Sequence, residues 1–103
     1  MKTYRVTISD ETLAGVEKHL DYLAEQTGSE DNGIRWWERA LEKIFSLEKL
    51  PNRCPLAPEN EFEELEIRML LVGSCLFLFT VDESNRVARI LNFRHGSQEA
   101  RPL

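Results

Sequence analysis

The sequence predicts one α+β domain, in which a helical hairpin packs on one face of a small, mainly antiparallel sheet. Three observations predict this class. A short run near the start alternates apolar and polar residues, residues 10–50 hold two amphipathic helical patterns, and residues 65–93 hold three β-rich runs separated by short turns. A chain of 103 residues has the length of a single domain, so we treat residues 1–103 as one unit with the order strand, helix, helix and three strands.

The first expected element is a strand over Lys2–Ile8. Tyr4, Val6 and Ile8 share one face and the residues between them are polar, which is typical of a strand with one buried face. Ser9 or Asp10 then caps a helix, because short polar side chains bond the free amides of a first helical turn.

Two helices follow, joined by a short polar turn, and they are expected to form an antiparallel hairpin. Gly28 is the expected C-cap of the first helix, and the second is expected from about Gly33 to Leu50, with Pro51 just past its end. The expected buried stripes are Leu13, Val16, Leu20, Leu23 and Ala24 in the first helix, and Ile34, Trp37, Leu41, Ile44 and Leu47 in the second.

The adjacent Trp36 and Trp37 point about 100° apart on a helix, so both cannot occupy the centre of one stripe. We expect Trp37 in the core and Trp36 at its periphery. A peripheral tryptophan is a candidate anchor for a partner protein, although it can also serve only to cover the seam between the two helices.

An irregular loop over residues 51–63 holds three of the four prolines and leads back to the sheet. The acidic residues from Glu59 to Glu66 are expected to form a solvated rim. We expect no metal site there, because these acids are not interleaved with the glycine and asparagine of a calcium loop.

The last third of the chain reads as a three-stranded meander. Its middle run, Cys75–Val81, is apolar almost throughout and is expected to be the central strand, buried on both faces. The final run leads into Arg94-His95-Gly96, where Gly96 permits a sharp turn.

Composition limits the function. The net charge of −5 argues against a general nucleic-acid binder, and no direct DNA binding is expected. The start lacks the apolar core of a signal peptide and no apolar run is long enough to span a bilayer, so we expect a cytoplasmic protein without a membrane partner. The two cysteines are expected to be free thiols. No glycine-rich phosphate loop is present and no cofactor is expected.

The basic residues after Glu66 are all arginines, a side chain suited to phosphate or carboxylate. They are Arg68, Arg86, Arg89, Arg94 and Arg101. His95 is a candidate acid or base, and with the arginines it would suit RNA cleavage through the 2′-hydroxyl. The alternative is a histidine that ends a strand and bonds only backbone. Pairing of Cys54 or Cys75 with His19 or His95 is a further candidate, and it lacks any orienting group.

The order and spacing of these elements resemble the RelE/ParE superfamily of type II toxin–antitoxin toxins, also called plasmid-stabilisation proteins. The resemblance covers nearly the whole chain. The segments that carry it are W-x3-L-x2-I-x2-L-x3-P from Trp37 to Pro51, R-C-P-L-A-P-E at 53–59, I-R-x-L-L-x-G at 67–73, L-F-T-V-D at 78–82 and Arg94-His95-Gly96.

The resemblance implies a RelE-like fold and a growth-inhibiting toxin that is neutralised by a cognate antitoxin protein. Members of the RelE-like branch cut mRNA on the ribosome, whereas the ParE-like branch inhibits DNA gyrase. Arg68, Arg94 and His95 are the catalytic candidates if the chain cuts RNA, and the partner-binding candidates are Trp36, Arg89, Arg94 and Gly96.

The sequence departs from the family at two places. Cys75 and Leu76 stand where an aromatic residue and an arginine are usual, and Ser97 and Gln98 stand where a basic pair is usual. These changes and the acidic charge favour a ParE-like binding role over catalysis. A RelE-type endoribonuclease and a non-toxic binding module that keeps the fold are the alternatives.

Overall fold

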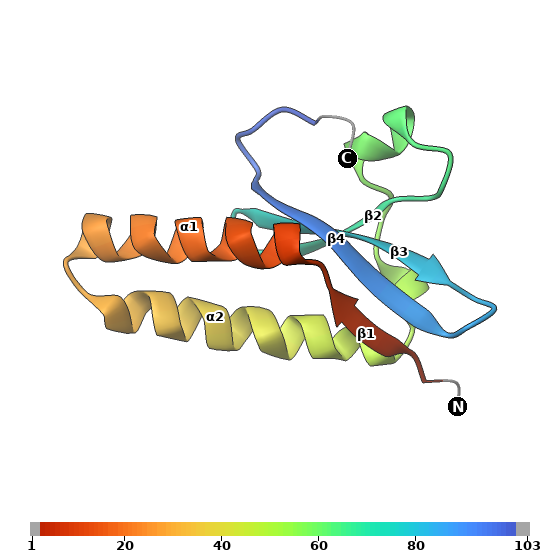
Figure 1. Cartoon of the computed structure of the whole chain (residues 1–103), viewed down its shortest axis with the longest axis horizontal. Coiled ribbons are helices and arrows are strands. Elements are labelled where there is room, and N and C mark those ends of the chain that lie inside the picture. The colour runs from red at the N-terminus through yellow and green to blue at the C-terminus, as the bar shows by residue number, and fades with distance from the viewer. Residues whose placement is uncertain (1–2, 101–103) are drawn as a thin grey trace.

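The computed structural model describes residues 3–100 as a helical hairpin packed on a four-stranded sheet (Figure 1). The order of helices and strands predicted from the sequence is confirmed. The elements are β1 (Arg5–Ile8), α1 (Asp10–Thr27), α2 (Glu30–Phe45), β2 (Arg68–Val72), β3 (Cys75–Asp82) and β4 (Val87–His95), with three 3-10 turns, η1 (Ser46–Glu48), η2 (Pro51–Arg53) and η3 (Pro58–Phe62), between α2 and β2.

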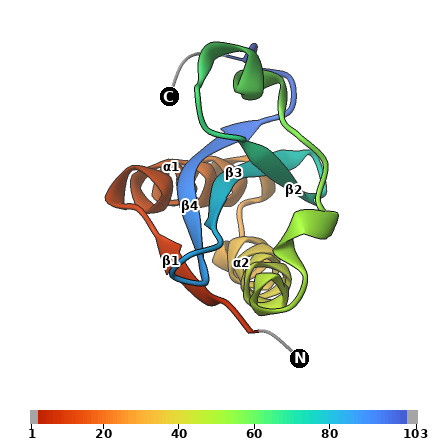
Figure 2. The same cartoon turned by 90° about the vertical axis from the view of Figure 1, so that its right-hand side faces the viewer.

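The strands lie in the order β1-β4-β3-β2. The β2–β3–β4 meander is antiparallel, and β1 joins it by pairing parallel to β4. Both helices lie on one face of the sheet, and the segment that contains η3 covers the other (Figure 2). Because each face is covered, residues 75–79 of β3 are buried on both sides, as their apolar run predicts.

Polar caps decide where the helices begin and end. The Ser9 hydroxyl accepts a hydrogen bond from the Thr12 amide at the start of α1, and Gly28 ends that helix with a φ of 68°. Ser29 caps α2, which therefore begins at Glu30 rather than near Gly33. The helix also ends at Phe45, five residues earlier than predicted, because the chain tightens into η1.

The buried face of α2 differs from the predicted stripe. Trp36 is 8% exposed whereas Trp37 is only half-buried, so the predicted placement of the two tryptophans is wrong. Ile34 in the predicted stripe is also exposed, as is Leu13 on α1. The cause is a close approach of the helices. A Cβ built on Gly33 would lie 3.3 Å from Leu20, so small residues face inward where large ones were expected.

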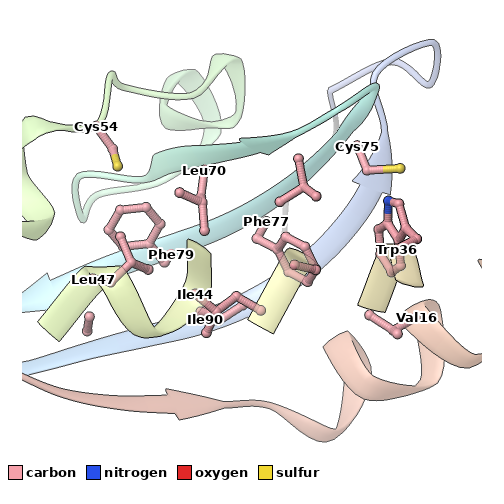
Figure 3. Close-up of a cluster of buried hydrophobic side chains, with 13 residues drawn as sticks. Val16, Trp36, Ile44, Leu47, Cys54, Leu70, Cys75, Phe77, Phe79 and Ile90 are labelled. Carbon is pink, nitrogen blue, oxygen red and sulfur yellow. The ribbon is translucent and has the colours of Figure 1, made fainter. Parts of the chain in front are cut away.

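A β-bulge in β4 sets which side chains face the helices. Leu78 of β3 pairs with Asn92 and Phe79 pairs with Ile90, so Leu91 is an extra residue on β4. Ile90 and Phe93 consequently both pack in the main core under the helices, part of which Figure 3 shows. Leu91 packs instead on the opposite face, in a small cluster with Ala57, Ile67, Met69 and Leu78.

Candidate functional site at the end of strand β4

Arg94 is held by a carboxylate from η3. Its Nη2 and Nε both donate to Glu59, with an Nη2–Oε1 distance of 3.1 Å, and Nη1 donates to the Gln98 carbonyl at 2.9 Å. Glu59 is 1% exposed, so the prediction that it belongs to a solvated rim is wrong. A buried carboxylate needs a charged, hydrogen-bonded partner, and Arg94 is that partner. The guanidinium is therefore already occupied by an anion from its own chain.

His95 lies on the other side of β4 and is exposed. Its Nδ1 is 2.7 Å from the Ser97 hydroxyl and accepts from the Ser97 amide at 3.1 Å. Its backbone amide donates to the Gln98 side chain at 2.9 Å. Ser97 and Gln98 therefore hold the imidazole and the end of the strand in place.

Gly96 marks the turn that was predicted, and its position also requires a small residue. Its amide donates to the Ser74 carbonyl at 2.7 Å, in the turn between β2 and β3. An added Cβ would lie 2.9 Å from that oxygen, closer than real Cβ contacts allow. The glycine therefore lets two turns of backbone meet.

The three catalytic candidates are not brought together. Arg68 pairs with Phe79 on the β2 side of β3, and Arg94 pairs with Leu76 on the β4 side. Their backbones are two strands apart across the sheet, which is about 10 Å, and three residues apart along β3, which adds about 10 Å more. The Arg68 side chain bonds the Cys54 carbonyl at 2.6 Å and Glu66 at 3.2 Å.

Arg89 lies nearer the opposite end of β4 and is tied to its own hairpin. Its Nη1 donates to Asp82 at 2.9 Å. Hydrogen bonds from Asn85, followed by the Arg89 contact, lower the pKa of Asp82 from 3.8 to about 2. Arg89 is thus a half-exposed cation in an ion pair. Arg101, by contrast, lies outside the described residues.

Beside the Arg94–His95 end of β4, an aromatic cluster joins α1, α2 and the sheet. Trp36 contacts the rings of His19 and Phe93 at centroid distances of 4.7 and 5.8 Å. The Cys75 sulfur is 3.6 Å from His19 Nε2, and Figure 3 shows Trp36 beside Cys75. From the sequence, His19 is only a possible partner of a cysteine, and its position one residue before Leu20 on the inner side of α1 is the local sign of its burial.

The surroundings of Cys75 and His19 do not favour a nucleophilic cysteine. Burial raises the pKa of the Cys75 thiol. Burial and the nearby His95 lower the pKa of His19. A thiol and a neutral imidazole in an apolar cluster form packing contacts, since an active cysteine needs its thiolate stabilised. Burial also raises the pKa of Cys54, and both cysteines are free thiols, as predicted.

Within residues 3–100, no three metal-binding side chains come together. No helix in that part of the chain is both long enough and apolar enough to cross a membrane. The end of β4 presents an exposed histidine, an internally paired arginine and two apposed turns.

Comparison with known proteins supports the fold. No family model and no curated protein sequence matches the chain. Among solved structures, a chain of the chromosomal ParDE TA system from P. aeruginosa matches with a TM-score of 0.71 at 14% identity, covering 92% of this chain and 98% of that chain.

Two further structures match over nearly their whole length. The toxin–antitoxin complex RelBE2 from Mycobacterium tuberculosis matches with a TM-score of 0.60 at 19% identity, covering 95% of this chain and 97% of that chain. The archaeal RelE–RelB complex from Pyrococcus horikoshii matches with a TM-score of 0.59 at 21% identity, covering 94% of this chain and 99% of that chain. The protein therefore has the RelE-like α+β fold.

Proposed function

We propose that this protein is the toxin of a type II toxin–antitoxin pair and that it acts in the cytoplasm, as ParE-like toxins do, by binding a target protein such as DNA gyrase. The observation that carries the proposal is the near end-to-end match to a chain of a ParDE system. A cognate antitoxin would hold the chain inactive. Fold likeness alone is an analogy, so the residues at the end of β4 must carry the rest.

Those residues favour binding over RNA cleavage. A cleavage arginine must be free to hold the phosphate as charge develops, and Arg94 is instead neutralised by Glu59. Arg68 lies on the far side of β3 and bonds elsewhere. Leu76 at a usually basic position is 6% exposed and opposes Arg94 in the sheet. The chain also carries a net charge of −5, which opposes docking on a ribosome.

The second candidate is a ribosome-dependent endoribonuclease. The exposed imidazole of His95 and the matches to two RelBE complexes favour it. A non-toxic module that keeps the fold is the third candidate, and it would explain why Cys75 and Leu76 are buried in place of an aromatic residue and an arginine.

Pulse-labelling in a bacterial host that expresses this chain alone tests all three. An early fall in thymidine incorporation with methionine sustained is expected for a gyrase-type toxin. An early fall in methionine incorporation would favour RNA cleavage. Soluble protein with neither effect would contradict a toxin. Purified chain should inhibit gyrase supercoiling, and no inhibition at high excess would contradict the proposed target.

A matched pair of variants separates binding from cleavage. His95→Ala removes the candidate acid or base at an exposed position, and Glu99→Ala is an exposed control nearby. Under the binding proposal both variants keep their toxicity. The endoribonuclease would be favoured if only His95→Ala lost toxicity and if cells expressing the parent chain showed a defect in translation. Arg94→Ala is less informative because it also leaves Glu59 buried and unpaired.

A further inference from the structure

One surface loop is fastened to the sheet and still leaves large apolar side chains in water. This η3 loop, residues 55–67, stands on the face of the sheet opposite α1 and α2, where Figure 1 shows it in green. At its base the Ala57 amide donates to the Ile67 carbonyl at 2.7 Å, and in its middle Glu59 pairs with Arg94. The loop is therefore held in place before any partner arrives, which lowers the cost of binding.

The packing of the loop against the sheet accounts for only some of its apolar residues. Ala57 and Ile67 are buried in the small cluster on the outer face of the sheet. Phe62 and Leu65, by contrast, are 46% and 65% exposed, and Leu56 is exposed as well. Because Phe62 and Leu65 contribute little to the core, their burial against a partner is the larger gain open to them, and aromatic residues are common anchors of protein interfaces.

The charge that the loop presents to solvent is negative. It holds no basic residue and five acidic ones, Glu59, Glu61, Glu63, Glu64 and Glu66. Two of these acids pair with Arg94 and Arg68, whose side chains are only 13% and 19% exposed, so these cations are largely hidden from a partner. Glu61 and Glu64, each one residue before an exposed apolar side chain of the loop, are themselves exposed.

This charge selects the kind of partner that fits the exposed apolar residues. Nucleic acid, an anionic lipid surface and a second copy of this chain would each bring like charge against the loop. A protein surface rich in lysine and arginine would bring opposite charge, which speeds encounter and orients the partner.

We propose that the η3 loop is a docking surface for a basic surface of the protein that this chain targets. Phe62 and Leu65 enter apolar pockets on that protein, and the carboxylates of Glu61 and Glu64 face lysines and arginines around those pockets. This inference deepens the proposed function, on which it rests, by giving the chemistry of the target's contact surface. A target that handles DNA has surfaces of this kind, because it must hold phosphates.

The apolar and acidic residues of the loop make different contributions to such a complex. Apolar side chains buried at the centre of an interface carry most of the affinity, and exposed charges at its rim carry little. Charges at the rim act chiefly on the rate of association and on its dependence on salt. Removal of the two apolar side chains should therefore weaken binding more than neutralisation of the two carboxylates does.

The test uses the full chain labelled with nitrogen-15 and a short synthetic peptide in which lysine alternates with leucine. The peptide is expected to shift the amide signals of Phe62, Glu64 and Leu65 at lower concentrations than any others. A peptide with glutamate in place of lysine should not bind, and one with serine in place of leucine should bind at least about tenfold more weakly. Shifts confined to α1 and α2 would overturn the proposal, as would tighter binding of an RNA oligonucleotide to the loop.

A matched pair of variants tests the apolar contribution. Phe62→Ser/Leu65→Ser should weaken binding of the lysine–leucine peptide by at least about tenfold. The control, Tyr22→Ser/Ile34→Ser, removes two similarly exposed apolar side chains from the helical hairpin and should leave the affinity unchanged. Urea denaturation checks that both variants fold. Equal losses of affinity in the two folded variants would overturn the proposal.

A second pair tests the charge. Glu61→Gln/Glu64→Gln should reduce the salt dependence of peptide binding, because fewer charges then face the lysines. Asp21→Asn/Glu25→Asn removes two exposed carboxylates from α1 and keeps the net charge of the two variants equal. It should leave the salt dependence as it is in the parent chain, and an equal reduction in both variants would show that the peptide senses only the overall charge.

Growth of bacteria that express each variant separates this inference from the proposed function. Phe62→Ser/Leu65→Ser is expected to lose the growth arrest that the parent chain causes, whereas Tyr22→Ser/Ile34→Ser keeps it. Full growth arrest by the first variant would overturn the inference and leave the proposed function standing. A parent chain that causes no arrest would contradict the proposed function, and the inference would fall with it.

Discussion

Folding removes the Glu59 carboxylate from water, and a single guanidinium compensates for the loss of hydration. Removing one member of a buried ion pair leaves the other charge uncompensated and is far more costly than replacing both members. Arg94 is therefore first a residue that fastens η3 to the end of β4.

We expect Glu59→Ala to lower the free energy of unfolding by about 3 kcal/mol, measured by urea denaturation. The double variant Glu59→Leu/Arg94→Met should recover most of that loss, because neither charge then remains buried. Glu61→Ala, an exposed change on the same turn, is the control and should stay within about 0.5 kcal/mol. If the losses measured for Glu59→Leu and Arg94→Met separately add up to the loss in the double variant, that result would contradict the pairing.

His19 makes the stability of the fold depend on pH. Burial, and then repulsion from His95, lower its pKa in the folded chain, while the unfolded chain keeps a value of about 6.5. Below that value the unfolded state binds more protons than the folded state, so the free energy of unfolding falls as the pH drops from about 6.5 toward the lowered folded pKa.

The His19→Phe variant should lose this dependence while it keeps an aromatic ring against Trp36 and Phe93. Urea denaturation at pH 7.5 and 5.5 measures it, a range that lies above the usual carboxylate pKa values. Tyr22→Phe serves as a control, since it should show the same pH dependence as the parent chain. A parent chain equally stable at both values would contradict the assignment.

At the scale of elements, the bulge at Leu91 determines what the end of β4 presents. Successive side chains on a strand face opposite sides, and one extra residue reverses that order beyond it. The reversal puts Phe93 into the core with Phe77, at a centroid distance of 5.0 Å, and turns Arg94 toward η3.

Deletion of Leu91 should therefore force Phe93 out of the core or shift the register of β4. We expect the deletion variant to lose cooperative unfolding. Near-ultraviolet circular dichroism and thermal denaturation measure this loss. Leu91→Gly keeps the residue count and the bulge while it removes the side chain that packs against the small cluster of Ala57, Ile67 and Leu78. The glycine variant should stay folded at reduced stability. A deletion variant as stable as the glycine variant would contradict the role of the bulge.

At the scale of the whole molecule, β1 closes the fold. It pairs parallel with β4, and the Tyr4 amide donates to the carbonyl of Glu48, the last residue of η1, at 2.8 Å. The Tyr4 hydroxyl donates to Glu83 at 2.7 Å, a bond that raises the pKa of the tyrosine. The two ends of the described chain are thus joined through the sheet.

A truncated chain that starts at Ser9 should fail to fold cooperatively. Without β1, the apolar strand β4 would become an edge of the sheet and the core residues beside it would be exposed to water. Circular dichroism and urea denaturation measure this outcome. Tyr4→Phe keeps the ring and loses only the bond to Glu83, so it should cost about 1 kcal/mol. A truncated chain with a cooperative transition would contradict this account of β1.

The sequence by itself determined the order of the elements, the first strand's inner face, the two ends of α1 and the doubly buried strand β3. These features are written in local patterns, since alternation, helical spacing and cap residues act within a few positions. It also identified the Arg94-His95-Gly96 turn as the chemically richest place, and it predicted the RelE-like fold that comparison confirms.

Only the tertiary structure decided which tryptophan is buried, that Glu59 neutralises Arg94 and that Arg68 lies apart from the end of β4. Each of these depends on contacts between residues far apart in the chain. A carboxylate among five acids, or a tryptophan beside another, has the same local pattern whether buried or exposed. Whether such a residue is buried depends on the approach of a second element, which removes water and supplies the partner charge.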